Sequence, residues 1–354
     1  MNIAVLMGGV SEEREVSLAS GAQVARAVRE AGHQVLAVDT SHGILSPADE
    51  EALLEAGIKD PSPSSLPGDL LLTGDTGALT REPRIAETDV VFLALHGGSG
   101  EDGTIQTLLA LAGIPFVGSD RVGCALAMDK DLSKRLMRDA GIPTPQWITV
   151  RGRAEGESRF SEVAETLGFP VIVKPPSGGS TVGLTLAHDE GELGEALDLA
   201  LTYEERVLFE AYIQGRELTV GILGDEALPV GEIIPEHELF DYECKYRPGM
   251  AQEIFPAELP EAVATRVQSY ALAAHEALGM RDFSRVDFIL DGEGVPWCLE
   301  ANALPGLTSN SLLPKAAAAA GIDFPTLCHR VAEMGRARAR ADREPGQRDG
   351  GFPG

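Results

Sequence analysis

The sequence has no long hydrophobic run. Hydrophobic residues make up 44% of its 354 residues, yet no apolar stretch approaches the about 18 residues that a membrane-spanning helix requires. The first residues carry no basic segment, and they reach Gly8 and Gly9 too early for a signal peptide. The sequence therefore predicts a globular protein with no membrane partner, and we expect a cytoplasmic location.

Basic side chains are scarce. Lys and Arg total 29 against 55 Asp and Glu, which gives a net charge of −26 at pH 7. Lysine occurs at only six positions: Lys59, Lys130, Lys134, Lys174, Lys245 and Lys315. This acidity argues against nucleic acid and anionic membranes as partners. A nucleotide remains compatible with it, because Mg²⁺ and a few local cations can reverse the field inside a pocket.

Cysteine is also rare. The four cysteines are Cys124, Cys244, Cys298 and Cys328, and they show neither C-x-x-C nor zinc-site spacing. We expect reduced, structural thiols. The chain length is sufficient for two or three domains of ordinary size.

The most informative segment that is present spans residues 284–312. Residues 285–290 and 295–300 read as strands, and 291–294 as a turn. Because side chains alternate along a strand, Arg285 and Asp287 share one face. A four-residue hairpin loop would pair Leu290 with Val295 and place Asp287 opposite Cys298. Glu300 would then be a diagonal neighbour of Asp287 on the same face.

Asn302 follows on that face if the second strand continues. Two carboxylates and one amide oxygen are hard ligands that suit Mg²⁺, whose other positions substrate phosphates can fill. The opposite face of the hairpin is apolar, so it should pack on a core while the polar face lines a cleft. The alternative is that Asp287 and Glu300 are ordinary solvated carboxylates.

Hydrophobic periodicity predicts an α/β protein. A strand at 2–7, a helix at 13–31 and a strand at 34–39 form a βαβ unit, which implies a parallel sheet. Residues 41–86 are rich in Pro, Gly and Ser and predict a variable loop region, which is followed by a strand at 89–95. Later expected elements are helices at 105–112, 129–140, 190–201, 260–278, 311–320 and 324–337, and strands at 170–174, 184–187, 206–211, 217–223 and 228–234.

Three glycine-rich segments are candidate ligand loops. Residues 176–183 follow a strand that ends in Lys174, so backbone amides and one ammonium could hold phosphate. Residues 8–14 and 96–103 each follow a strand of the expected parallel sheet, at the edge where ligands bind. Each segment also has an interpretation without a ligand: 176–183 could be a flexible turn, Ser11 a helix cap and His96 a structural residue.

Glu210 and Glu217 end and begin neighbouring strands. Their carboxylates could accept hydrogen bonds from an adenine amine and from ribose hydroxyls, or they could be plain surface residues. Together with the segments above, they favour a nucleotide site built from separate parts of the chain.

Five motifs in sequence order carry a family resemblance. They are Gly-Gly-Val-Ser-Glu-Glu-Arg-Glu-Val-Ser-Leu (8–18), Leu-His-Gly-Gly-Ser-Gly-Glu-Asp-Gly-Thr-Ile-Gln (95–106), Met-Asp-Lys (128–130), Asp-Tyr-Glu-Cys-Lys-Tyr (241–246) and Leu-Glu-Ala-Asn-Ala-Leu-Pro-Gly-Leu-Thr-Ser-Asn-Ser-Leu (299–312). The set resembles the D-alanine–D-alanine ligases, which have the ATP-grasp fold. The resemblance covers residues 2 to about 335.

The resemblance implies an α/β architecture in four parts. An N-terminal Rossmann-like domain (1–118) would precede two α+β subdomains, 119–214 and 215–337, that sandwich ATP. The third part would carry the metal site and a lid loop at 235–252, and a disordered tail would begin at residue 338. A homodimer is usual in this family.

The resemblance also implies a reaction. ATP would phosphorylate the carboxylate of one D-alanine, and the amine of a second would displace phosphate to give the dipeptide used in peptidoglycan. Glu13 would hold the first substrate's ammonium, with His96 nearby, while Ser311 and Leu312 would bind the second substrate's carboxylate. Arg285 and the amide of Gly306 would stabilise the tetrahedral intermediate.

The implied ATP and metal ligands complete the site. Lys130, Lys174 and Lys245 would contact phosphates, Glu210 the adenine and Glu217 the ribose, with Ala211 and Ile213 beside them. Asp287, Glu300 and Asn302 would hold two Mg²⁺ or Mn²⁺ ions. Ser180 and Tyr246, with Glu13, would latch a mobile loop over the site. Tyr246 favours an amine as second substrate.

One position departs from the family pattern. Many members have Lys after the glutamate at 210, and this chain has Ala211, so one adenine contact should be lost. Two other functions stay open: a different ATP-grasp ligase, including one that makes D-alanyl-D-lactate or D-alanyl-D-serine, and a non-catalytic ATP-binding protein.

Overall fold

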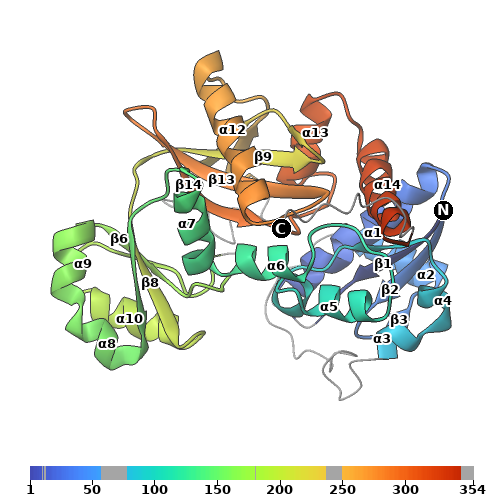
Figure 1. Ribbon diagram of the computed structural model, residues 1–354, viewed down its shortest axis with the longest axis horizontal. Coiled ribbons are helices and arrows are strands. Elements are labelled where there is room, and N and C mark those ends of the chain that lie inside the picture. The colour runs from blue at the N-terminus through green and yellow to red at the C-terminus, as the bar shows by residue number, and fades with distance from the viewer. Residues whose placement is uncertain (10, 12, 57–77, 180, 237–248, 344–354) are drawn as a thin grey trace, which may run out of the picture.

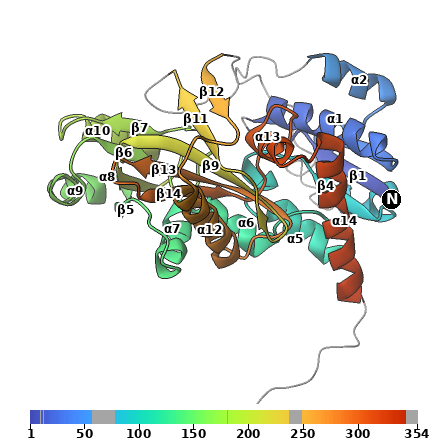
Figure 2. The same ribbon diagram turned by 90° about the horizontal axis from the view of Figure 1, so that it is seen from above.

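The computed structural model describes residues 1–9, 11, 13–56, 78–179, 181–236 and 249–343. Within them the strands form three sheets, each with helices packed against it (Figures 1 and 2). No helix in the described ranges is long and apolar enough to span a membrane. The α/β architecture expected from the sequence is confirmed.

The N-terminal sheet has the strand order β3-β2-β1-β4. Its strands are β1 (Asn2–Met7), β2 (Gln34–Asp39), β3 (Gly43–Ile44) and β4 (Val90–Leu93). β1 pairs in parallel with both β2 and β4, as the βαβ pattern predicted. Residues 3–7 are buried without interruption, which is typical of a parallel strand covered on both faces. The carboxyl ends of the parallel strands β1, β2 and β4 meet at one edge of the sheet.

Helices cover both faces of that sheet. α1 (Arg14–Glu30) packs on β1 and β2, and α14 (Phe324–Arg343) lies beside α1 and β4 (Figure 2). The other helices of this part are α2 (Pro47–Ala56), α3 (Ala78–Arg81), α4 (Pro83–Ala86), η1 (Gly98–Gly100) and α5 (Thr104–Leu111). Leu223 and Phe283 of the third sheet join the same hydrophobic cluster, so the first and third parts share a core.

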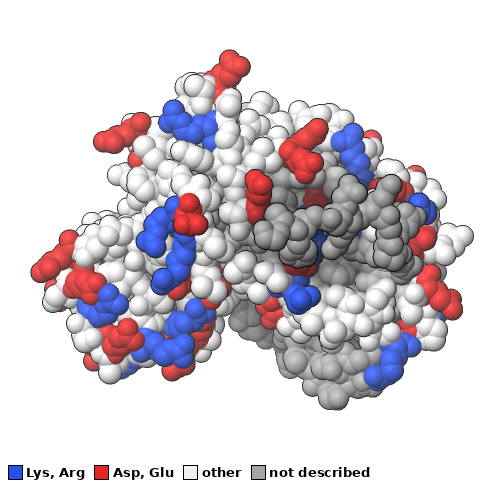
Figure 3. Space-filling model, in the orientation of Figure 1, with Lys and Arg blue, Asp and Glu red and all other residues white. Residues whose placement is uncertain are grey.

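The central sheet is antiparallel, with the order β5-β8-β6-β7. Its strands are β5 (Trp147–Arg151), β6 (Val171–Lys174), β7 (Thr185–Ala187) and β8 (Arg206–Ala211). α8 (Gly152–Ser158), α9 (Phe160–Leu167) and α10 (Leu193–Leu201) pack on it. Figure 3 shows acidic and basic side chains interspersed over this lobe, at its lower left. Arg153 of α8 pairs with Glu157 and Asp198.

The third sheet has the order β12-β11-β9-β13-β14, and β10 pairs with β9. Its strands are β9 (Gly215–Leu223), β10 (Glu226–Ala227), β11 (Gly231–Pro235), β12 (Ala251–Ile254), β13 (Phe283–Asp291) and β14 (Pro296–Asn302). α6 (Arg121–Met128), α7 (Lys130–Asp139), α12 (Glu261–Ala277) and α13 (Leu312–Ala319) pack against it. Figure 1 shows α7 between this sheet and the central lobe.

The predicted hairpin forms, but its register differs from the prediction. Leu290 pairs with Pro296 rather than Val295, and a bulge next to Asp287 places Asp287 directly opposite Glu300. Leu299 is the extra residue of the bulge, because Phe288 pairs with Cys298 while Asp287 pairs with Glu300. The predicted pairings of Leu290 and Asp287 were therefore wrong, whereas the prediction that Asp287 and Glu300 share one face is confirmed, because the bulge brings them onto the same side.

The predicted disordered tail does not begin at Arg338. α14 continues to Arg343. The guanidinium of Arg338 donates to the Phe116 carbonyl at 2.7 Å and pairs with Asp282, which fixes this end of the helix on the body of the protein. Residues 344–354 lie outside the described part of the chain.

Candidate active site

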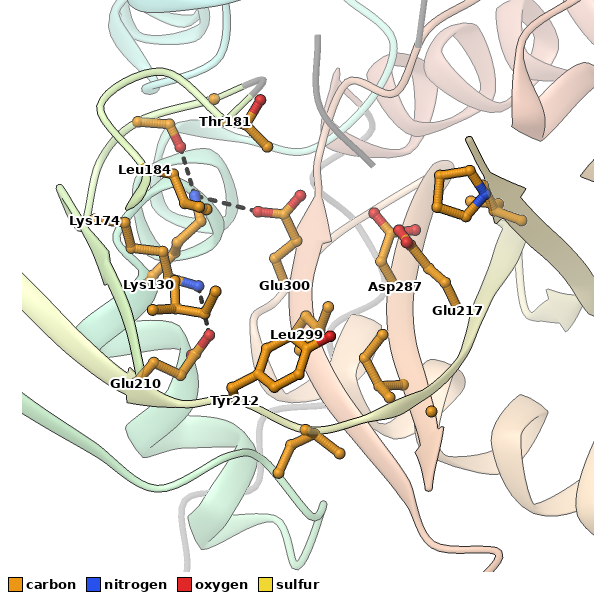
Figure 4. Close-up of a pocket in the computed structure, with 18 of the residues that line it drawn as sticks. Lys130, Lys174, Thr181, Leu184, Glu210, Tyr212, Glu217, Asp287, Leu299 and Glu300 are labelled. Atoms are coloured by element: carbon orange, nitrogen blue, oxygen red, sulfur yellow. Dashed lines mark hydrogen bonds and ion pairs between the residues drawn. The ribbon is translucent and has the colours of Figure 1, made fainter. Parts of the chain in front are cut away.

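A cavity of about 440 Å³ lies between the central and third sheets. Its lining includes Lys130, Lys174, Glu210, Ala211, Ile213, Glu217, Asp287, Glu300 and Leu312 (Figure 4). These residues come from α7, from strands β6, β8, β9, β13 and β14, from the segment after β8, and from the start of α13. The two sheets thus bring together residues that the sequence assigned to the nucleotide and to the metal, and also Leu312, which was assigned to the second amino acid. Lys245 lies outside the described residues.

Two lysines and one glutamate form a buried charged group at the edge of this cavity. Lys174 donates to Oε1 of Glu210 at 2.6 Å, and Lys134 lies 2.7 Å from Oε2. Burial raises the pKa of Glu210, but the two ammonium groups outweigh burial and hold that pKa below its ordinary value. Glu210 is therefore an anion whose two oxygens both face cations, and it positions Lys174 as well as lining the cavity.

The polar face of the β13–β14 hairpin forms the opposite wall. Arg285 donates to Oδ1 of Asp287 at 2.9 Å and to Oδ2 at 2.8 Å. Asn302 and Thr219 also donate to the Asp287 carboxylate, at 3.0 and 2.7 Å. Glu300 lies 3.2 Å from the ammonium of Lys130. The predicted convergence of these side chains on one face is confirmed.

The oxygen donors on this face fit a divalent cation. Within the described ranges no group of three His, Cys, Asp or Glu side chains is placed to hold a metal. The set here is instead Asp287, Glu300 and the Asn302 amide, all hard oxygen ligands of the kind Mg²⁺ takes alongside phosphate. Arg285 and Lys130 offset the charge of the two carboxylates, which would otherwise repel each other across the strands.

The glycine-rich loop after β6, residues 176–183, is held by hydrogen bonds. The backbone N–H of Lys130 donates to the Pro176 carbonyl at 3.0 Å, and its ammonium donates to the Gly178 carbonyl at 2.5 Å. The Ser177 amide donates to Glu204 at 3.0 Å. Thr181 has a positive φ of 61°, a strained conformation that often marks a ligand loop. Ser180 lies outside the described residues.

A second, smaller cavity of about 90 Å³ adjoins the first. It is lined by Glu13, His96, Glu101, Asn302 and Gly306, and it shares Lys130, Gly178, Gly179, Arg285 and Glu300 with the larger cavity. Glu13 precedes α1 at the carboxyl edge of the N-terminal sheet. A Cβ built on Gly97 would lie 3.1 Å from Oε2 of Glu13, and one on Gly179 would lie 3.6 Å away. The three glycine-rich segments therefore meet at Glu13.

His96 is buried and has two polar neighbours. Its Nε2 lies 3.1 Å from the Ser20 hydroxyl, and its Nδ1 lies 3.6 Å from the Glu101 carboxylate. Burial raises the pKa of Glu101, and the nearby Glu13 carboxylate raises it further. A hydrogen bond with His96 lowers this pKa but does not outweigh burial. Glu101 was not predicted as a site residue, although it is one of two acidic residues in the His96–Gly103 motif.

The segment after β14 brings two of its predicted residues to the cavities, whereas Ser311 lines neither of them. Gly306 lines the smaller cavity and Leu312 the larger one. The Ser311 hydroxyl accepts a hydrogen bond from the Thr308 amide at 3.1 Å, and a Cβ on Gly306 would lie 2.9 Å from it. Gln23 of α1 accepts from the Ser309 amide at 2.8 Å and so ties this segment to the N-terminal part. Tyr246 lies outside the described residues.

Comparison with known proteins agrees with this geometry. The family models described as D-ala D-ala ligase N-terminus and D-ala D-ala ligase C-terminus match residues 2–119 and 136–333. A D-alanine–D-alanine ligase of Moorella thermoacetica is 39% identical over 340 residues, covering 94% of this chain and 99% of the relative. The corresponding ligase of Aquifex aeolicus is 42% identical over 328 residues, covering 92% and 98%.

Solved structures give the same result. The D-alanine–D-alanine ligase of Bacillus anthracis complexed with ATP superimposes with a TM-score of 0.75 at 31% identity, covering 97% of this chain and 99% of that one. The VanG D-Ala:D-Ser ligase of Enterococcus faecalis gives a TM-score of 0.79 at 30% identity, covering 94% and 99%.

The fold and its two connected cavities define an enzyme of the ATP-grasp ligase class. Two sheets face each other across the larger cavity, and a Rossmann-like sheet contributes to the smaller one. The chain belongs to the D-alanine–D-alanine ligase family.

Proposed function

We propose that the protein joins two D-alanine molecules into D-alanyl-D-alanine while ATP is cleaved to ADP and phosphate. The observation that carries this proposal is the wall shared by the two cavities. Lys130, Arg285 and Glu300 line both. A triphosphate in the larger cavity and an amino-acid carboxylate in the smaller one would therefore meet at the same cationic groups.

The first step is phosphorylation of a carboxylate. Glu13 receives the ammonium of the first D-alanine, and His96 and Glu101 close the pocket behind it. The carboxylate of this D-alanine faces Arg285. A carboxylate oxygen attacks the γ-phosphorus of ATP, the bond to the β–γ bridging oxygen breaks, and an acyl phosphate and ADP result. Such a transfer needs positioning and charge neutralisation more than covalent chemistry from the protein.

The second step forms the peptide bond. The neutral amine of the second D-alanine attacks the acyl carbon, its excess proton leaves, and inorganic phosphate departs. Arg285 and the Gly306 amide would stabilise the negative charge on the tetrahedral intermediate's oxygen. Ser311 and Leu312, at the start of α13, would bind the second carboxylate.

The larger cavity would hold ATP, with Lys130 and Lys174 at the phosphates. A volume of about 440 Å³ lies within the range of nucleotide-sized sites. Glu217 would reach the ribose, and Glu210, Ala211 and Ile213 the adenine. Because both oxygens of Glu210 already face lysines, an adenine amine would have to share this carboxylate with them.

Asp287, Glu300 and Asn302 would hold two divalent cations, Mg²⁺ or Mn²⁺. When bound, such ions neutralise phosphate charge and align the phosphoryl group. Arg285 and Lys130 each contact one of the two carboxylates and so hold them in place beside the cavity.

The remaining parts of the proposal concern the chain as a whole. The division into 1–118, 119–214 and 215–337, with a lid at 235–252, would place substrate recognition, ATP binding and metal binding in successive parts. Lys245 and Tyr246 in that lid, and Ser180, would close the site and keep water from the acyl phosphate. We further propose a homodimer that works in the cytoplasm on peptidoglycan precursors.

Product analysis tests the proposal. The protein would be incubated with ATP, Mg²⁺ and D-alanine, and dipeptide, ADP and phosphate would be quantified. Equal amounts of the three are expected, with no product from L-alanine. Parallel reactions with D-serine or D-lactate as second substrate address the alternative that the D-Ala:D-Ser neighbour suggests. ADP release without any D-alanine product would reject the proposal.

A further inference from the structure

Lys134 is a fully buried lysine to which the proposed reaction assigns no role. Its side chain in α7 has no exposed surface, whereas Lys174 keeps 8% exposure and borders the ATP cavity. An ammonium group at this depth is strongly destabilised unless charged and polar partners compensate for lost water. Its partners therefore indicate what the lysine is for.

Those partners connect Lys134 to the ATP cavity. Its ammonium lies 2.7 Å from Oε2 of Glu210 and donates to the Thr144 hydroxyl at 2.6 Å. It also lies 5.1 Å from the centre of the Trp147 ring, whose face attracts cations. The other Glu210 oxygen accepts from Lys174, as Figure 4 shows. One carboxylate is thus shared by two ammonium groups.

The charge of this group matters for a phosphate ligand. Two positive charges and one negative charge leave a net charge of +1 on Lys134, Lys174 and Glu210. If Glu210 had only Lys174 as partner, the two would form a closed neutral pair at the cavity wall. A lysine that is fully engaged by its own carboxylate attracts phosphate weakly.

We propose that Lys134 is a positioning residue for nucleotide binding. It neutralises Glu210 from the side away from the cavity, so that the charge of Lys174 stays available for ATP. This inference rests on the proposed function, in which Lys174 contacts phosphate. Lys134 itself touches neither substrate nor metal.

The same lysine also links the two sheets that enclose the cavity. Thr144, which accepts from Lys134, donates to the Cys298 carbonyl at 2.9 Å. The Cys298 amide in turn donates to the Pro143 carbonyl at 2.8 Å. Cys298 precedes Glu300 by two positions on β14. Lys134 therefore joins β8 of the central sheet to the strand that carries the proposed metal ligand.

The test is a charge-compensation experiment in the full-length protein. Lys134→Met, Glu210→Gln and the double variant would be compared with the wild type for binding of a non-hydrolysable ATP analogue with Mg²⁺, by calorimetry. Lys134→Met should weaken binding about 10-fold, the loss of roughly one charge-assisted contact. The double variant restores the net charge of +1 and should bind more tightly than Lys134→Met.

Steady-state kinetics and a control separate this role from a general structural one. KM for ATP should rise in Lys134→Met while kcat stays within about two-fold of the wild type, since no contact with the reacting groups is lost. Arg153→Met removes an exposed cation that pairs with Glu157 and Asp198 on the central sheet's lobe. It should leave analogue binding unchanged.

Two results would overturn the inference: unchanged analogue affinity in folded Lys134→Met, or a double variant as weak as the single one. If Lys134→Met is too unstable to purify, the comparison is made in the Glu210→Gln background. There, removal of Lys134 should weaken binding much less than 10-fold, because no carboxylate is left to engage Lys174, and a loss as large as 10-fold would contradict the charge argument. Failure of the wild type to make dipeptide would reject the proposed function instead, because analogue binding does not depend on turnover.

Discussion

Asp287 and Glu300 lie directly opposite each other across β13 and β14. Each is held by a cation of its own: Arg285 binds Asp287, and Lys130 approaches Glu300 to 3.2 Å. The bulge beside Asp287 produces this pairing and keeps both carboxylates on the cavity face. Glu300 therefore lies at the wall that the two cavities share, while Asp287 beside it lines the larger cavity.

Removal of one of these carboxylates should impair catalysis through the metal. Glu300→Gln keeps the size of the side chain but removes its charge, so kcat should fall about 100-fold and the Mg²⁺ concentration for half-maximal rate should rise. ADP release measured across a Mg²⁺ titration checks both effects. Glu293→Gln, in the exposed turn of the same hairpin, is the matched control. If both variants show the same Mg²⁺ dependence, Glu300 is not a metal ligand.

Glu13 should act on D-alanine and not on ATP. Its carboxylate lies next to Gly97 and Gly179 in the smaller cavity. Glu13→Gln should lower kcat/KM for D-alanine about 10- to 100-fold, because a charge-assisted contact to the ammonium is weakened. KM for ATP should stay near the wild-type value.

The control for this variant is Glu15→Gln, at the second residue of α1, the helix that Glu13 precedes. It should behave as the wild type does. A parallel rise in the KM of both substrates would mean that Glu13 supports the structure of the site and does not contact the amino acid.

The Arg14–Asp39 pair should make stability depend on pH. Arg14 donates to both oxygens of Asp39, at 3.0 and 2.6 Å, and both side chains are buried. Burial raises the pKa of Asp39, but hydrogen bonds from Arg14 and Ser41 outweigh it and hold that pKa below its ordinary value. A lowered pKa in the folded state means that the stabilisation is present above about pH 4, the unfolded value, and is lost as the pH falls through the folded value.

Asp39→Asn tests this dependence. At pH 7 it should lower the free energy of unfolding by about 3 kcal/mol, because it leaves Arg14 buried without its counter-charge. Urea unfolding at pH 7, 5 and 3.5 would measure the difference from the wild type, which should shrink at the lowest pH. A difference that is the same at all three values would show that the charge of Asp39 is not what stabilises the fold.

Gly21 should not tolerate a side chain. It lies where α1 crosses β1, and an added Cβ would come within 2.4 Å of Cβ of Met7. Gly21→Ala should therefore destabilise the protein by about 1–3 kcal/mol through overpacking. Gly194→Ala, in α10 with open space around it, should be neutral or stabilising by up to about 1 kcal/mol. Thermal melts of both variants check the contrast.

Much of the fold could be predicted because its patterns are local. The buried run of β1 and the alternation in the 285–302 hairpin indicated strands correctly, and alternation alone placed Asp287 and Glu300 on one face. The exact pairing was predicted wrongly, since a bulge at Leu299 has no signature in the period of two. α6, α8 and α9 were missed because each has only seven or eight residues, too few to show a clear helical period.

The site was predictable where motifs carried it and not elsewhere. Glu13, His96 and Arg285 lie in segments whose glycines or alternation mark them, and the structure brings them to one cavity. Lys134 has no such mark: its partner Glu210 is distant in sequence, and a lysine on a helix normally faces solvent. Only the packing of α7 between the two sheets reveals that it is buried.

The central claim is that ATP activates the carboxylate of D-alanine. D-alanine labelled with ¹⁸O in its carboxylate would be incubated with the enzyme, ATP and Mg²⁺, and the released phosphate analysed by mass spectrometry. Transfer of one labelled oxygen to phosphate for each dipeptide formed is the result that an acyl phosphate requires. Dipeptide accompanied by unlabelled phosphate would contradict the account.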